Sequence, residues 1–148
     1  MSSIRCFTSA CVAATALLLA SGVVRAQQPT LKPIATVRQL MQALIVPFSD
    51  AVFDAVYEPP KTDAQWTALR GTALALAESG NLLMIGRRAR DEGEWMQMAR
   101  NEVDAAEAVI KAIDAKNATA LAEAGNVLYE SCDGCHERYM HPQAPPVK

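Results

Sequence analysis

Cys132, Cys135 and His136 form the motif C-x-x-C-H near the end of a chain of 148 residues. In c-type haem proteins, two thiols with this spacing bond to the haem vinyl groups and the adjacent imidazole binds the iron. On a helix the three positions fall within about one turn, so all three side chains can reach one porphyrin. The motif therefore predicts one covalently bound haem c, with His136 as an axial ligand of the iron.

Three other uses of the two cysteines remain open from the sequence. A redox dithiol usually opens a helix beside a strand, whereas this sequence has no strand-like alternation of useful length. A structural zinc ion would need both cysteines together with His136 and His141, all crowded at one end of the chain. A plain disulfide would leave the adjacent histidine without a role. Haem attachment is the favoured interpretation.

The first 26 residues have the features of a secretory signal peptide. Arg5 precedes an apolar run that reaches Val24, and small residues lead to Ala26, after which we expect cleavage. The run is shorter than the roughly 20 residues that a spanning helix needs, which disfavours a retained anchor. Cys11 stands at the start of the run rather than at its end, which argues against a lipoprotein. We expect an exported, periplasmic protein, soluble after cleavage, in which residues 27–148 form one domain.

The charges exclude one class of partner. Removing Arg5 and Arg25 from the 14 basic residues leaves 12 against 16 acidic ones, a formal charge of −4 for the mature chain. The two signs are interspersed and form no basic patch, so we expect no nucleic-acid binding. The densest charged group, residues 87–94, contains both signs and is predicted to be a solvated turn.

The rest of the chain must supply the elements that position the motif. Apolar residues recur three and four positions apart, which predicts helices over residues 34–57, from Thr62 onward, over 92–115 and over 118–140, with Asn117 as a cap. The four buried faces are predicted to be Ile34, Val37, Met41, Leu44, Phe48 and Val52; Trp66, Leu69, Ala73, Leu76, Gly80 and Leu83; Trp95, Ala99, Val103, Ala106, Ile110 and Ile113; and Leu121, Gly125, Leu128, Cys132, Cys135 and Tyr139.

Individual residues mark where these helices begin and bend. Thr62 and Gln65 form the capping-box pattern at the start of the second helix. Pro47 lacks an amide donor, so we expect a kink near Leu44. Gly80 interrupts a buried face, which suggests close approach of another helix or of a flat cofactor. Short connections make consecutive helices antiparallel neighbours. The predicted fold is therefore all-α, an up-down-up-down antiparallel four-helix bundle with haem in its core.

With these features, the mature chain resembles the class II c-type cytochromes, the cytochrome c′ group and its low-spin relatives. The resemblance is carried by the C-x-x-C-H motif on the last helix, by Tyr139 three residues after the histidine, and by the first-helix sequence 37–41. Placement is the specific feature, because most other small c-type cytochromes attach haem near the N-terminus. The resemblance implies that Met41 binds the iron opposite His136, as in low-spin members, and that Arg38 pairs with a haem propionate.

Two positions depart from the family pattern. The family's first-helix arginine usually stands four residues before the iron-facing position, which is Gln42 here rather than Met41. A shift of helix register by one residue near Pro47 would reconcile the two. Many members have a basic residue four positions after the histidine, where this chain has Met140. The alternatives of an ordinary core methionine at 41 and a surface arginine at Arg38 stay open.

The predicted function is electron transfer with redox partner proteins, without enzymatic activity. The alternative is a five-coordinate iron that binds nitric oxide or carbon monoxide, which differs from the first reading at the ligand opposite the histidine. A haem enzyme such as a peroxidase would need a distal acid or base, and the sequence offers no histidine near Met41. The resemblance also allows a homodimer through the first two helices.

Overall fold

The structure, a computed structural model, describes residues 31–140, and within that range the chain is helical and contains no strand. The fold is all-α, as predicted. The signal peptide with its cleavage site, Cys6, Cys11 and His141 lie outside the described residues.

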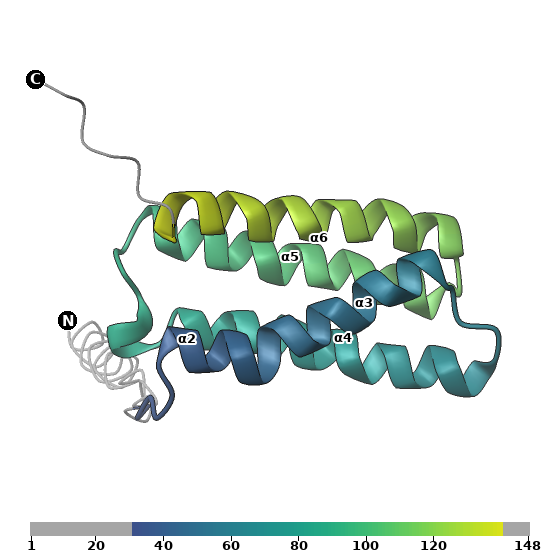
Figure 1. The fold of residues 1–148 in the computed structure, drawn as a ribbon, viewed down its shortest axis with the longest axis horizontal. Coiled ribbons are helices and arrows are strands. Elements are labelled where there is room, and N and C mark those ends of the chain that lie inside the picture. The colour runs from purple at the N-terminus through teal and green to yellow at the C-terminus, as the bar shows by residue number, and fades with distance from the viewer. Residues whose placement is uncertain (1–30, 141–148) are drawn as a thin grey trace, which may run out of the picture. The chain divides into compact units, whose positions relative to one another are not determined.

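Four long helical segments follow one another along the chain, as predicted (Figure 1). The first consists of α2 (Val37–Leu40), a π-helical turn η1 (Met41–Ile45) and α3 (Val46–Tyr57). The others are α4 (Asp63–Leu83), α5 (Glu94–Asp114) and α6 (Ala118–Tyr139), and a short 3-10 helix η2 (Gly86–Arg88) lies between α4 and α5. Each boundary falls within a few residues of the one that the sequence predicts.

Side chains that accept hydrogen bonds from the first turn explain where two of the helices begin. The Gln65 amide donates to the Thr62 hydroxyl over 3.2 Å, and the Thr62 amide donates to the Gln65 side chain over 3.1 Å, which confirms the predicted capping box. A second capping box joins Thr36 and Gln39. The first helix therefore begins at residue 37, and the prediction that Ile34 belongs to its buried face is wrong: this side chain is 81% exposed.

The first helix changes its hydrogen-bond pattern just before its proline, in the region where the sequence predicts a kink. The Val46 amide donates to the Met41 carbonyl, five residues back rather than four. This wider turn ends two residues before Pro47, which has no amide to donate. The turn inserts one residue into the helical register after Met41, so it leaves the three-residue spacing from Arg38 to Met41 unchanged.

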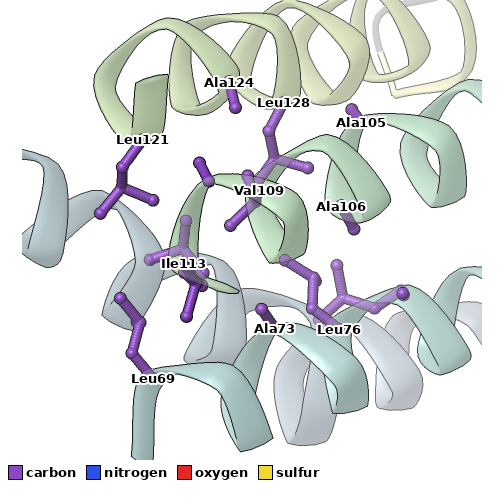
Figure 2. Packing of buried hydrophobic residues seen from close by; sticks show 14 of the residues in the cluster. Leu69, Ala73, Leu76, Ala105, Ala106, Val109, Ile113, Leu121, Ala124 and Leu128 are labelled. Carbon is purple, nitrogen blue, oxygen red and sulfur yellow. The ribbon is translucent and has the colours of Figure 1, made fainter. Parts of the chain in front are cut away.

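The core lies where α4, α5 and α6 meet. α4 packs against α5, α5 against α6, and α3 against α4 and α6. In Figure 2, the α4 side chains face Val109 and Ile113 of α5, with residues of α6 on the other side of α5. All six residues predicted for the buried face of α4 are buried. Alanines between the large side chains allow the helix axes to approach closely, which favours dense packing.

On α5, two of the six residues predicted for the buried face are each replaced by the residue one position before. Trp95, Ala99, Ala106 and Ile113 are buried as expected, but Glu102 and Val109 lie inward in place of Val103 and Ile110, which are half-buried. Residues 102 and 103 are neighbours on the helix, and apolar periodicity favours the valine. The contacts of α5 with α4 and α6 decide the orientation instead.

The connection between α4 and α5 is only partly the solvated turn that the sequence predicts, because one of its arginines is buried. Arg88 is 8% exposed, and its guanidinium donates to the carbonyls of Ala35 over 2.9 Å and Leu82 over 3.0 Å. These bonds tie the segment before α2 to the end of α4. Arg87 and Arg90 beside it are exposed, in agreement with the prediction.

Taken together, α2, η1 and α3 form the one described segment that is long and apolar enough to cross a membrane, Val37–Tyr57, with a mean hydropathy of 1.3. A helix of a soluble protein's core meets the same criterion, and α3 packs against two other helices here.

Candidate functional site

The C-x-x-C-H motif lies in the last two turns of α6, beside a cavity of about 290 Å³. Residues from all four helical segments line this cavity. Its apolar wall consists of Met41, Ile45, Phe53, Leu83, Met98 and Ala99, and Cys132, Cys135 and His136 line it from α6. The structure therefore brings the three residues of the motif to one apolar space.

The two cysteine side chains are free thiols and half-buried. Burial and the neighbouring Glu102 carboxyl together raise the pKa of Cys132 to about 11. Burial also raises the pKa of Cys135. Both thiols are therefore protonated at neutral pH. Catalytic dithiols need the opposite, a lowered pKa that yields the thiolate nucleophile. The electrostatics of the site disfavour the redox-dithiol reading.

Met41 lines the cavity from η1 and is half-buried, whereas Gln42 is exposed. The structure thus places the methionine, rather than the residue in the strict family register, at the same cavity as His136. Met98 of α5 also lines this cavity. From the sequence, Met98 fits the ligand position less well than Met41, because it stands one position before the predicted buried residue Ala99.

Arg38 does not line this cavity. It is exposed and lies one turn before Met41, at a second concavity that it shares with Arg87, Arg88 and Arg90. The structure therefore does not place Arg38 among the residues that line the cavity of the motif.

Tyr139 fastens the end of α6 to the start of α5. Its hydroxyl donates to Asp91, and its ring meets the Trp95 ring edge to face at a centroid distance of 4.9 Å. Arg138 adds an ion pair of 2.7 Å with Glu94. Burial and the Asp91 carboxylate raise the pKa of Tyr139 to about 12, and the hydrogen bond from this hydroxyl lowers the pKa of Asp91. These contacts hold the helical turn that follows the motif.

Glu102 also lines this cavity, and it is not among the residues that the sequence predicts for the site. Its side chain is buried, with 5% exposure, and neither carboxylate oxygen has a hydrogen-bond partner within the described part of the chain. Burial raises its pKa to about 8. A charged residue three positions after Ala99 and three before Ala105 was a detectable signal, because both neighbours on that face are small and apolar.

The Glu102 carboxyl group explains why residue 80 is a glycine. A Cβ atom at position 80 would lie 1.7 Å from Glu102 Oε2 and 2.8 Å from Val103 Cγ2. Real atoms do not approach so closely, so only glycine leaves room for the glutamate at this point of α4. Of the two predicted reasons for Gly80, close approach to another helix is the one that the structure shows.

No family model, no curated protein and no solved structure matches this chain. The site's chemistry therefore has to be judged from its own residues. Within residues 31–140, no three His, Cys, Asp or Glu side chains gather as a metal site. Iron in haem takes four ligands from the porphyrin and needs only one or two from protein, so the donor set of two thiols, one imidazole and one thioether fits haem.

Proposed function

We propose that this protein is an exported, periplasmic mono-haem c-type cytochrome that passes single electrons between redox partner proteins. The observation that carries the proposal is the position of the whole C-x-x-C-H motif on one helix, at an apolar cavity with Met41 in its wall. The proposed architecture is an up-down-up-down four-helix bundle, which the contacts between consecutive helices support.

Each residue of the site has one role in this proposal. Cys132 and Cys135 hold the haem through thioether bonds, which their protonated, half-buried thiols favour over thiolate chemistry. His136 and Met41 would be the two protein ligands of its iron. When bound, the haem provides a one-electron couple. The apolar walls exclude water, so the iron would change its charge in a low-dielectric environment that favours the less charged state.

The cavity has to enlarge to take the cofactor. Its volume of about 290 Å³ lies at the lower end of the range of small-molecule sites, roughly 300 to 1,000 Å³. Side chains along the wall would therefore move when haem is attached. Met41 belongs to a π-helical turn, a type of turn that is frequent at functional sites.

The family resemblance suggests that Arg38 pairs with a haem propionate, and we include this role in the proposal. It stands one helical turn from Met41 and at the edge of the second concavity, where it is exposed. A propionate that leaves the cavity toward this side would meet its guanidinium. A homodimer through the first two helices also belongs to the proposal, and exposed apolar side chains on those helices, Val46, Tyr57 and Leu74, support it.

The second candidate is a five-coordinate iron that binds nitric oxide or carbon monoxide. One observation favours it: Met41 shares the wall with Ile45 and Phe53, apolar side chains that would leave the iron open if the thioether did not bind. The two functions therefore differ in whether Met41 is a ligand.

Absorption spectra of the purified protein test the proposal. Acid extraction should leave the haem on the wild-type chain and should release it from a Cys132→Ala, Cys135→Ala variant. The ferrous protein should have a low-spin spectrum that carbon monoxide does not change. Met41→Ala should open the iron to carbon monoxide, whereas Met98→Ala, the matched control from α5, should not.

A wild-type protein that releases its haem into acid would contradict covalent attachment. A high-spin wild type that binds carbon monoxide at once would contradict ligation by Met41 and favour the second candidate. If Met98→Ala, rather than Met41→Ala, opens the iron, then the ligand comes from α5.

A further inference from the structure

Glu102 is a buried acid with no partner. Among the residues that the structure describes, its two carboxylate oxygens are the only buried side-chain N or O atoms without a hydrogen bond. Leaving such a group unpaired costs free energy, and an ionised carboxylate costs far more than a neutral one. A buried polar group without a partner needs an explanation, and Glu102 lies at the cavity of the motif.

The chain makes space for this carboxyl group. Gly80 on α4 leaves the volume that Glu102 Oε2 fills, since a Cβ there would lie 1.7 Å away. Two helices thus cooperate to hold an acid, rather than an apolar side chain, beside the cavity of the C-x-x-C-H motif.

The other titratable groups around Glu102 leave it uncompensated. From α6, Cys132, Cys135 and His136 line the same cavity together with the exposed Tyr129 and Asp133. From α3, the exposed Asp50 lines it as well. α4 contributes Leu83 to the cavity wall and Gly80 beside the carboxyl, neither of which carries charge. None of the described residues that line the cavity is Lys or Arg. The oxidised cofactor would bring a positive charge into this cavity, whose lining supplies no cationic side chain.

We propose that Glu102 is the proton-binding group of this redox site: it takes up one proton when the haem iron is reduced and releases that proton when the iron is oxidised. The proposal rests on the proposed function, because it needs the haem iron. In the balanced step, a one-electron donor reduces ferric to ferrous iron, the Glu102 carboxylate takes a proton from solvent, and the O–H bond of the neutral acid forms.

Electrostatics explain why Glu102 would bind its proton on reduction of the iron rather than on oxidation. A ferric porphyrin core carries one positive charge and a ferrous core carries none, so oxidation stabilises the carboxylate and reduction removes that stabilisation. In the chain without haem, burial raises the pKa of Glu102 to about 8. A ferric core beside the carboxyl would hold this pKa lower than a ferrous core would, so reduction favours uptake of the proton.

The reduction potential as a function of pH tests the proposal, with haem-loaded wild type, Glu102→Gln and Asp50→Asn. The wild-type potential should fall as pH rises, by up to about 59 mV per pH unit, the value for one proton per electron. Glu102→Gln should lose most of this slope. Asp50→Asn, which removes an exposed acid from the edge of the same cavity, should keep it. A pH-indicator dye in weak buffer should report proton uptake on reduction by the wild type and not by Glu102→Gln.

Equal slopes in the wild type and Glu102→Gln, or an equal loss of slope in Asp50→Asn, would overturn the proposal. If Glu102→Gln fails to fold, infrared difference spectra of the wild type decide: a protonated-carboxyl band that appears on reduction supports the proposal, and its absence overturns it. A chain with no covalent haem would overturn the proposed function itself. A haem-loaded chain with a pH-independent potential would overturn the role of Glu102 alone.

Discussion

The two halves of the helical core are built differently. From the middle of the helices to the connection between α5 and α6, large apolar side chains fill the interior, and Leu76, Ile113 and Leu121 are fully buried. Around the C-x-x-C-H motif, the same helices enclose a cavity with an unpartnered carboxyl group in its wall. The first half has the close packing that stabilises a small domain, and the second departs from it.

The half of the core beside the motif contains two features that lower the stability of the fold. A buried acid without a partner and an unfilled space both destabilise a fold, and both occur beside residues that can hold a cofactor. Local departures of this kind are expected at functional sites, because consistent packing everywhere would leave no room for a ligand. Four measurements can test whether the two halves differ in this way.

The largest effect is expected in the packed half. Leu76→Ala should lower the free energy of unfolding by about 2 to 5 kcal/mol, because it leaves a cavity among fully buried neighbours. Leu74→Ala, on the same helix with a side chain that is 40% exposed, should cost much less. Urea unfolding followed by circular dichroism measures both. Similar losses in the two variants would show that this half is not closely packed.

A smaller effect is expected in the cavity half. Gly80→Ala should destabilise the fold by about 1 to 3 kcal/mol, because the new methyl group collides with Glu102 and Val103. Gly71→Ala on the same helix meets nothing within 4 Å and should stabilise the fold by up to about 1 kcal/mol, the difference in helix propensity. The same unfolding experiment compares them. The two substitutions should change the free energy of unfolding in opposite directions. A stabilising Gly80→Ala would contradict the position of the carboxyl group.

The pH dependence of stability should reveal Glu102 before haem is attached. Its pKa is raised from 4.5 to about 8 in the folded chain, so between these values the folded state binds a proton that the unfolded state has lost. Stability should therefore fall as pH rises through this window, by at most about 1.4 kcal/mol per pH unit. Glu102→Gln should remove that decline. Parallel pH profiles for the two chains would argue against a buried, unpartnered acid.

The smallest effect should come from Tyr139 and have the opposite pH dependence. The hydrogen bond from Tyr139 lowers the pKa of Asp91, so it stabilises the fold above the unfolded pKa of this acid and is lost as pH falls. Tyr139→Phe should lower the melting temperature slightly at neutral pH and less in acid. Tyr57→Phe, at a side chain that is 85% exposed, should change nothing. A deficit that grows in acid would contradict this assignment.

Much of the architecture was predictable from local sequence. The capping box of Thr62 and Gln65 marked the start of α4, and Asn117 that of α6, because these side chains bond to amides only three residues away. The buried face of α4 was also correct throughout. In each case the determining interactions lie within a turn or two of the same helix, so the sequence contains them directly.

Tertiary structure decided the rest. Whether residue 102 or 103 of α5 lies inward depends on how α4 and α6 contact α5, and apolar periodicity alone favoured the wrong one. The buried state of Arg88 depends on carbonyls 53 and 6 residues away in the chain.

The sequence by itself determined the all-α class and the motif Cys132, Cys135 and His136 on one helix, because spacing along a helix fixes which side chains share a turn. Only the tertiary structure determined that Met41 and Met98 line the same cavity and that Glu102 stands there without a partner. The physical reason is that a cavity and an unsatisfied acid are properties of several helices together, and no single helix encodes them.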